Sequence, residues 1–491
     1  EKEYNEAAQA CVAPGAFDCE AFCLNAILKV AARLKGAFAI AVLSKHTPSA
    51  VYAARCESPL AVGYNEDGFY LLSDIDALSE FTSLGTPLDN KSAAVISLSD
   101  GIKFVRFDGT ESAQRFSVLE KSDKKTHGDT EKQFKGDKML AEIYETPSAL
   151  EKCALNFPFY DSEFFRRIPL NSFDEIRFIG CGTAYHAALH GAFLTRKLCK
   201  KLTVSAHLAS EYLYDNYRED TSVLLVLVSQ SGETADTLGV LRRAQKNRTY
   251  CLAVVNCESS ALAREADFCI FTKAGREVAV ASTKAYNTQL LILTLLAYNI
   301  AGARGQTTVS KLNNAYETAK KIGSYAAAAL ENECAAKAIA QEIKEKKDVF
   351  FIGRGLDSFC ALEGALKLKE VSYIHAEGFA AGELKHGSIA LIEDGTPVIA
   401  LLTQPETAQK TQNGIEEVKA RGAAIHRLTV ANSGKKSKAD RCNLVLPHIE
   451  NADFLPVIAT IPLNFVAYYT ALYKGCDADK PRNLAKSVTV E

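Results

Sequence analysis

The residues best suited to chemistry form the hydroxyl-rich stretch 229–234, with the sequence Ser-Gln-Ser-Gly-Glu-Thr. It follows an apolar segment, 223–228, and precedes a helical pattern over 235–245. A strand, a polar turn and a helix start make an anion site, because first-turn N–H groups lack intrahelical partners and the helix dipole is positive there. Because no lysine follows in the Walker pattern, a single phosphate ester is predicted rather than a nucleoside triphosphate. The alternative is an ordinary helix cap, since Ser and Thr are the usual capping residues.

A second candidate is the charged stripe Glu363, Lys367 and Glu370, whose spacing places all three on one helical face. The neighbouring residues are mostly apolar, which leaves little purely solvated face. A carboxylate beside a lysine in a partly buried cleft can act as a base near neutral pH. An exposed salt-bridged stripe is the alternative. His386, at a helix end or in a loop, is an acid/base candidate, although a lone histidine is more often structural.

The last candidate is Lys486, which lies in a compact C-terminal segment with few charges. Chain ends are usually disordered, but this one is apolar. A desolvated lysine has a lowered pKa and can form a Schiff base with a ketone.

These candidates lie within an internal repeat. Residues 178–182 and 351–355 open two similar strand–turn–helix segments 173 positions apart. Residues 226–230 match 400–404 at an offset of 174, and two later strand segments match at 174 and 176. Alternation of strand and helix in each copy predicts an α/β fold with two doubly wound parallel sheets.

The two copies differ at the anion loop. The second copy reads Thr-Gln-Pro-Glu-Thr over 403–407, so it lacks the glycine and one residue, and Pro405 removes an N–H. The anion site is therefore expected in the first copy. Ligands of open α/β sheets bind beyond the carboxyl ends of strands, where Cys181–Gly182–Thr183 and Ser282–Thr283 are also expected.

Residues 1–118 form a separate block with a helix over 24–34 and a buried strand over 36–43. Strand-like segments at 51–54, 60–64, 69–72, 94–98 and 102–107 predict an antiparallel sheet with a helical layer. The expected organisation is this block, a linker over 119–140, the two repeats over 141–306 and 307–474, and a C-terminal tail over 475–491.

Composition excludes several classes of protein. The 491 residues carry a net charge of −2, which gives no reason to expect nucleic acid or an anionic membrane surface as a partner. The longest apolar run, near 290–301, is too short to span a bilayer. Fourteen cysteines without a Cys-x-x-Cys pair favour a reducing, cytoplasmic setting. Neither a metal ion nor a cofactor is expected.

Six segments together resemble the glutamine–fructose-6-phosphate amidotransferase (glucosamine-6-phosphate synthase) family: 229–234, 280–285, 362–370, 373–377, 382–387 and 481–491. The resemblance covers nearly the whole chain. It implies two sugar isomerase (SIS) domains, of flavodoxin-like topology, after part of an α+β N-terminal-nucleophile glutaminase domain. It also implies an aminotransferase and ketose–aldose isomerase that makes glucosamine 6-phosphate from fructose 6-phosphate and glutamine, for UDP-N-acetylglucosamine synthesis.

The same resemblance assigns roles to individual residues. Lys486 would form the Schiff base, Glu370 would move the proton between C1 and C2, and Lys367 would tune Glu370. His386 would open the sugar ring from the neighbouring subunit of a homodimer. The phosphate and sugar would be held by Cys181, Gly182, Thr183, Ser229, Gln230, Ser231, Thr234, Val280, Ser282 and Ala485. Ala184 departs from the family, which commonly has a serine there.

The first block resembles only the second half of the family's glutaminase domain. Asp18, in the sequence Phe-Asp-Cys-Glu, matches the aspartate that holds the amino group of glutamine. The nucleophilic N-terminal cysteine has no counterpart, because Cys11 and Cys19 have amino groups locked in peptide bonds. We therefore expect a fragment or trimmed form of the enzyme that, as given, does not hydrolyse glutamine.

Two other functions remain open from the sequence. One is a plain sugar-phosphate isomerase or fructosamine-phosphate deglycase with two SIS domains, against which the Asp18 block and the Lys486 tail argue. The other is a non-catalytic sugar-phosphate sensor, for which Glu370, Lys367, His386 and Lys486 would be surplus.

Overall fold

The computed structural model describes residues 18–73, 75–119, 134, 136–432 and 443–489. The chain divides into two compact units. One contains residues 1–124 with 233–235 and 487–491, and the other contains 125–232 and 236–486.

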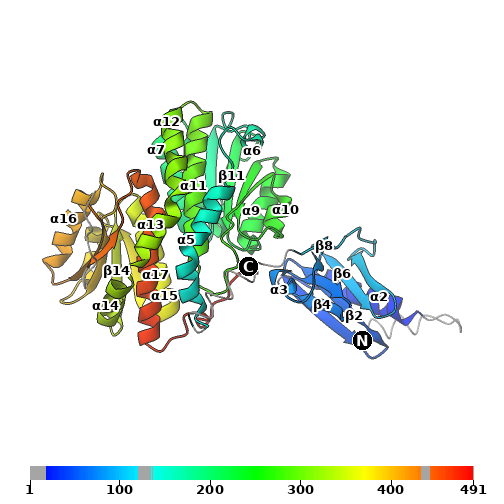
Figure 1. The fold of residues 1–491 in the computed structure, drawn as a ribbon. Helices are drawn as coiled ribbons and strands as arrows, with labels where there is room; N and C mark the ends of the chain where they lie inside the picture. The colour runs from blue at the N-terminus through cyan, green and yellow to red at the C-terminus, as the bar shows by residue number, and fades with distance from the viewer. Residues whose placement is uncertain (1–17, 74, 120–133, 135, 433–442, 490–491) are drawn as a thin grey trace. The chain divides into compact units, whose positions relative to one another are not determined.

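The first unit contains two antiparallel four-stranded sheets, drawn in blue in Figure 1. Their strand orders are β1-β2-β6-β7 and β4-β3-β5-β8. Helix α2 (Cys19–Arg33) packs Cys23, Leu28 and Ala31 against the first sheet, as the expected helical layer. The strands are β1 (Phe38–Ser44), β2 (Thr47–Cys56), β3 (Ala61–Asn65), β4 (Gly68–Leu72), β5 (Leu84–Pro87), β6 (Ser92–Ser97), β7 (Gly101–Arg106) and β8 (Ser117–Val118), and a short helix, α3, spans Ile75–Leu78.

Strand β1 differs from its prediction. Its side chains alternate between half-buried and exposed, because β1 is an edge strand of a sheet that packs α2 on one face. Because alanine is apolar, the alanines on the exposed face led to the prediction that the whole segment is buried. Strands β5 and β8 were not predicted.

The second unit contains two five-stranded sheets with the same order and only parallel pairs, β10-β9-β11-β12-β13 and β15-β14-β16-β17-β18. This confirms the predicted repeat and its flavodoxin-like topology. The first sheet consists of β9 (Glu175–Gly180), β10 (Thr203–Leu208), β11 (Val223–Ser229), β12 (Tyr250–Val255) and β13 (Phe268–Phe271). The second consists of β14 (Asp348–Gly353), β15 (His375–Ala380), β16 (Pro397–Leu401), β17 (Ala424–Val430) and β18 (Asn443–Leu446).

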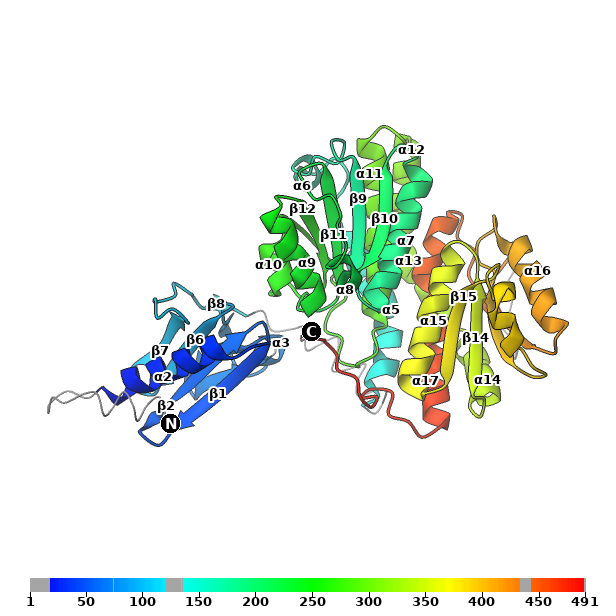
Figure 2. The same cartoon turned by 180° about the vertical axis from the view of Figure 1, so that it is seen from behind.

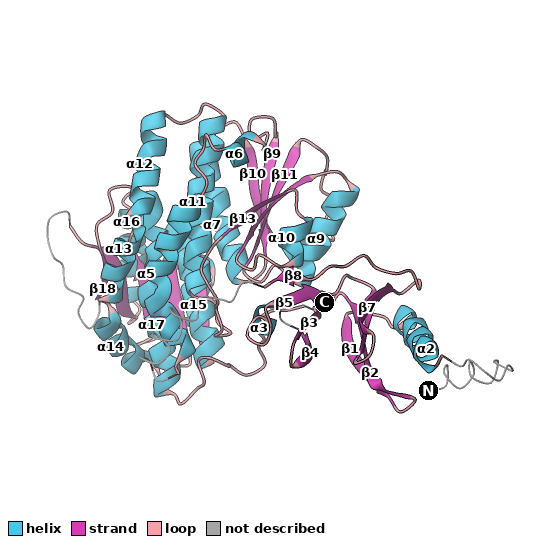
Figure 3. Ribbon diagram, turned by 45° about the vertical axis from the view of Figure 1, so that its right-hand side comes forward, coloured by secondary structure: helices cyan, strands magenta, loops and turns pink. Residues whose placement is uncertain are grey.

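A layer of helices lies between these two sheets (Figures 1 and 2) and shares one continuous apolar core with both. These helices are α5 (Lys138–Asn156), α7 (Thr183–Leu198), α11 (Lys284–Ala303), α13 (Ile322–Leu330), α15 (Leu356–Ser372) and α17 (Leu455–Tyr473). Figure 3 shows them side by side in cyan. The remaining helices are α6 (Glu163–Arg166), α8 (Ala209–Tyr212), α9 (Ala235–Lys246), α10 (Ala261–Glu265), α12 (Val309–Lys320), α14 (Glu333–Ile343) and α16 (Ala408–Lys419), with short 3₁₀ helices η1 (Leu384–His386), η2 (Ser388–Leu391) and η3 (Ala452–Phe454).

The region 452–473, which contains α17, is long and apolar enough to cross a membrane by composition, but 94% of its most apolar window is buried inside the protein. A helix that is hydrophobic all round belongs in the core of a large protein when its surroundings are protein. Helix α17 is therefore a central core helix, packed against α13, α14 and α15.

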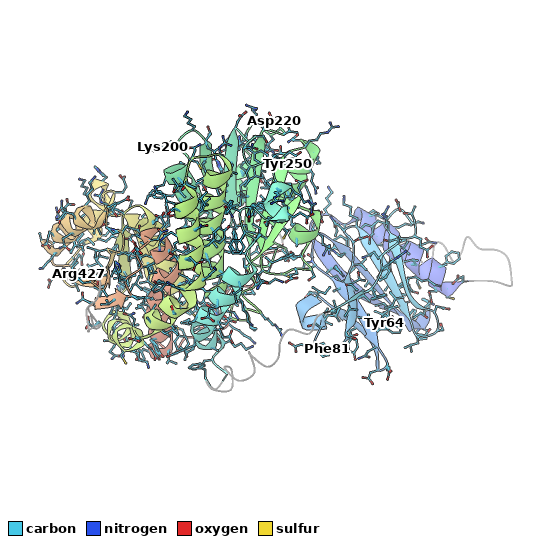
Figure 4. The ribbon with its side chains drawn as sticks, turned by 45° about the horizontal axis from the view of Figure 1, so that its top comes forward. Tyr64, Phe81, Lys200, Asp220, Tyr250 and Arg427 are labelled. Atoms are coloured by element: carbon cyan, nitrogen blue, oxygen red, sulfur yellow. The ribbon has the colours of Figure 1, made fainter. Side chains whose placement is uncertain are left out.

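The direction of the strands fixes where a site can form. In Figure 4, Lys200, Asp220 and Tyr250 gather at one end of the first parallel sheet. They stand before or at the start of β10, β11 and β12, so this is the amino end of the strands. The candidate phosphate residues follow the opposite, carboxyl ends, at β9 and β11, where the strand order reverses.

Candidate functional site

The loop after β11 is held in place by its own polar groups. The Ser229 hydroxyl accepts the N–H of Gly232 at 2.9 Å, and the Gly232 carbonyl accepts the N–H of Leu262 at 3.1 Å. Gly232 has a φ of +67°, and a Cβ there would lie 2.2 Å from the Ser260 hydroxyl oxygen. Only glycine fits this position, so the residue lost from the second copy is the one that shapes the loop.

Thr183, in the first turn of α7, joins this copy to the other. Its hydroxyl donates to Glu363 Oε1 at 3.0 Å and accepts from Lys367 Nζ at 3.0 Å. Lys367 Nζ also lies 2.6 Å from Glu370 Oε2. A continuous polar chain therefore runs from the sugar-phosphate candidate Thr183 to the candidate base Glu370.

Glu363 and Lys367 are each only 1% exposed, so the predicted stripe is buried rather than solvated. The other Glu363 oxygen contacts His186 Nδ1 at 2.7 Å. Burial opposes ionisation of Glu363, but Lys367 and His186 outweigh it and lower the pKa of the carboxyl. Burial likewise opposes the charge on Lys367, but Glu370 and Glu363 raise its pKa above the usual range. Lys367 is thus a charged, paired ammonium, a poor nucleophile and a good electrostatic partner.

Lys486 lies in a different setting from the apolar one expected. Its ammonium contacts Glu277 Oε2 at 2.6 Å, and its side chain is 24% exposed. Glu277 is fully buried and also accepts the Ser282 hydroxyl at 2.9 Å. Its other oxygen accepts the N–H groups of Thr283 (2.8 Å) and Ala285 (3.1 Å), which caps the start of α11.

More acidic groups surround this pair. Burial opposes ionisation of Glu277, yet Lys486 and the hydrogen bonds lower its pKa to about 2. Burial, with the Glu277 charge, raises the pKa of Glu142 to about 8. Glu142 accepts the N–H groups of Val278 and Ala279, and Lys284 Nζ contacts Glu145 at 2.6 Å. The segment that carries Val280 and Ser282 is therefore fixed to α5 by the side chains of Glu142 and Glu145.

The C-terminal tail is anchored before it reaches Lys486. The Asp479 carboxylate accepts the N–H groups of Lys138 and Met139 at the start of α5, and its carbonyl accepts the N–H of Val280 at 3.0 Å. The Arg482 N–H donates to the Tyr373 hydroxyl at 2.8 Å, and its guanidinium lies 4.3 Å from the centre of that ring. These contacts bring Lys486, Ser282 and Val280 together from distant parts of the chain.

Other predicted residues lie outside this contact network. His386 ends η1 and is exposed, and no described contact joins it to Glu370 or Lys367. Ala485 is exposed, and Cys181 contacts Thr237 at 3.9 Å. In the first unit, Asp18 caps α2 by accepting the N–H groups of Glu20 and Ala21.

Sequence reasoning missed Glu277 and Glu142. Glu277 stands five residues before Ser282, and Glu142 and Glu145 lie one helical turn apart, so an acidic pattern was visible locally. Their partners are more than 130 residues away in the chain, and local spacing cannot identify such pairs.

Comparison with known proteins agrees with the duplicated fold. The family described as SIS domain matches residues 170–298 and 342–474, together more than half of the chain. The glutamine–fructose-6-phosphate aminotransferase (isomerizing) of Clostridium tetani is 40% identical over 476 residues, which cover 95% of this chain and 77% of the relative. The enzyme of the same name from Thermococcus kodakarensis is 38% identical over 474 residues, covering 95% and 76%.

Solved structures are similar in the second unit. The C-terminal domain of glucosamine-fructose-6-phosphate aminotransferase from Francisella tularensis superimposes with a TM-score of 0.65 and 36% identity, covering 70% of this chain and 97% of that one. A glucosamine-6-phosphate deaminase from Thermotoga maritima has a TM-score of 0.55 at 24% identity, covering 72% and 99%, which supports the fold alone.

Proposed function

The chain belongs to the glutamine–fructose-6-phosphate aminotransferase (isomerizing) family, and we propose that it forms glucosamine 6-phosphate from fructose 6-phosphate and glutamine-derived ammonia. The observation that carries this proposal is the polar chain Glu363–Thr183–Lys367–Glu370, which places the acid/base group Glu370 two contacts from the sugar-phosphate residue Thr183.

The phosphate of the substrate binds the loop 229–234 at the start of α9. Hydroxyls of Ser229, Ser231 and Thr234, with the N–H groups of the first helical turn, are suited to a dianion. Gln230, Gly182 and Cys181 line the same strand ends, and Val280, Ser282 and Ala485 border the sugar.

Lys486 forms the imine. Its neutral amine attacks the C2 carbonyl of the open-chain ketose, water leaves, and the resulting iminium keeps a positive charge on nitrogen. Glu277, ionised because its pKa is about 2, is placed to stabilise that charge. In the free protein Lys486 is ion-paired with Glu277, so substrate binding must separate the two groups before the amine attacks.

Glu370 then transfers the proton. The iminium acidifies the C1–H bond, Glu370 takes this proton and returns it to C2, and Lys367, 2.6 Å away, orients the carboxylate. Ammonia adds to the C2 iminium and displaces the Lys486 amine before the proton reaches C2, because the nitrogen cannot be exchanged once C2 is saturated. The proton transfer then leaves the amino group on C2 and an aldehyde at C1. His386, exposed on η1, opens the sugar ring in the site of a second copy of the chain, within a homodimer.

We infer that the first unit serves the supply of ammonia. One oxygen of Asp18 caps α2, which leaves the other oxygen able to receive the amino group of glutamine. Cytoplasmic location accords with the described cysteines, which are all free thiols.

The test is product formation. Incubation of the purified chain with fructose 6-phosphate and either glutamine or ammonium chloride should yield glucosamine 6-phosphate from at least one nitrogen source, and Glu370→Gln should abolish it. Glucose 6-phosphate as the sole product with both nitrogen sources would instead identify a plain isomerase.

A further inference from the structure

The second sheet of the repeat has a group of hydrogen-bond donors at the position that corresponds to the anion site of the first sheet. We call this group, formed by Thr403 and Gln404, the cradle. Gly355 (φ +59°) precedes α15 just as Gly182 (φ +51°) precedes α7. With β9 and β14 aligned, Asp357 takes the position of Ala184. When β11 is aligned with β16 in the same way, Thr403 takes the position of Ser229, the last residue of β11. Gln404 then takes the position of Gln230.

Asp357 fills this cradle. Its side chain is fully buried, and Oδ2 accepts the N–H groups of Thr403 at 2.8 Å and Gln404 at 3.2 Å. Oδ1 accepts the Thr403 hydroxyl. The Asp357 carboxylate, after β14, thus accepts hydrogen bonds from two backbone N–H groups and one hydroxyl that follow β16. The anion at this position is a side chain of the protein rather than a ligand.

We propose that Asp357 is the resident anion of a former sugar-phosphate cradle, and that this side chain restricts sugar-phosphate binding to the first copy. The proposal rests on the proposed function for the position of the substrate phosphate. A fixed carboxylate takes the hydrogen-bond donors, occupies the space and repels a second anion. The first copy has the small, neutral Ala184 at the equivalent place, which leaves its strand ends open to a ligand.

The charge state of Asp357 agrees with this role. Burial raises the pKa of Asp357 to about 6, whereas the hydrogen bonds from Thr403 and Gln404 lower it. The side chain is therefore an anion at pH 7.5. Alanine at this position would leave three donors around an empty space, a costly arrangement that a small anion could relieve.

The first experiment is rescue by formate. The melting temperature of Asp357→Ala should rise saturably with sodium formate, by about 2 °C or more beyond the effect of equal sodium chloride. Wild-type protein and Asp357→Asn, which fills the space without a charge, should show only the general salt effect. A folded Asp357→Ala variant that responds to formate no more than Asp357→Asn would overturn the resident-anion assignment.

The second experiment moves the carboxylate into the first copy. Ala184→Asp should weaken fructose 6-phosphate binding at least 100-fold by calorimetry, whereas the uncharged, equally large Ala184→Asn should weaken it less than about 10-fold. Equal effects of the two substitutions would show that size alone acts and would contradict the proposal. The formate result does not depend on fructose 6-phosphate, so failure of the proposed function is recognised separately, by a wild-type chain that binds no sugar phosphate.

Discussion

At the scale of single residues, the site depends on buried charges that are paired rather than isolated. Lys367 lies between Glu363 and Glu370, and Lys486 contacts Glu277. Removing one partner of a fully buried pair leaves an uncompensated charge, so neutral substitution of Glu363, Lys367 or Glu277 should destabilise the fold. Glu370 is 20% exposed, so its substitution by Gln should be tolerated.

The phosphate loop gives the first residue-scale prediction. Ser231→Ala combined with Thr234→Ala should weaken fructose 6-phosphate binding by about 3–6 kcal/mol, since each charge-assisted hydrogen bond contributes about 1.5–3 kcal/mol. Isothermal titration calorimetry measures the change, with Ser259→Ala, on the loop before α10, as the matched serine control. Unchanged affinity would remove the phosphate from this loop.

Glu142 gives a pH-dependent prediction. Its folded pKa of about 8 lies above the ordinary value of 4.5, so the folded state keeps a proton that the unfolded state releases. Stability from this group is fully present below about pH 4.5 and falls as the pH rises towards 8. Between pH 6.5 and 8, urea unfolding should show stability falling in the wild type, and Glu142→Gln should reduce the fall.

The control is Glu151→Gln, an exposed position on the same helix, which should leave the pH dependence as in the wild type. A Glu142→Gln variant with the full wild-type slope would place the proton on another group.

At the scale of elements, the sequence predicted what is local and repeated. The 3.6-residue spacing of Glu363, Lys367 and Glu370 predicted one face of α15, and the constant offset near 174 predicted two equal sheets. The Lys486–Glu277 pair could not be predicted, because 209 positions separate its partners and only the folded tail brings them together. The exposed alanines of β1 were misread because apolar residues also occur on solvent-facing strand surfaces.

The packing of α15 gives the element-scale prediction. A Cβ at Gly364 would lie 2.9 Å from both Leu463 of α17 and Phe351 of β14, so these elements meet where only hydrogen fits. Gly364→Val should destabilise the protein by about 1–3 kcal/mol through overpacking. Urea unfolding tests this, with Lys369→Val on the exposed side of α15 as control. Equal stability of the two variants would contradict the close approach.

At the scale of the whole molecule, the proposed chemistry uses segments from both copies and the tail. Copy one supplies Thr183 and the phosphate loop, copy two supplies Lys367 and Glu370, and the tail supplies Lys486. The two copies share one sheet order and differ at Asp357, at Pro405 and at the missing glycine. In the proposed function, the first copy binds phosphate and the second transfers the proton.

The division of roles predicts that binding and proton transfer can be separated. Glu370→Gln should still form the imine with fructose 6-phosphate, since Lys486 is intact, but should lose exchange of the C1 proton with deuterium oxide. Proton NMR of the recovered sugar measures this exchange. If exchange continues at the wild-type rate, another group is the base, and His386 is the next residue to test.

Borohydride trapping tests most directly whether Lys486 forms the imine. The wild-type chain, reduced in the presence of fructose 6-phosphate, should carry the reduced sugar phosphate on the peptide that contains Lys486, as found by mass spectrometry. Lys486→Arg keeps the charge beside Glu277 but cannot form an imine, so it should show no adduct, while Lys369→Arg should show the wild-type amount. An adduct of wild-type yield in Lys486→Arg, on any other lysine, would show that Lys486 does not form the imine.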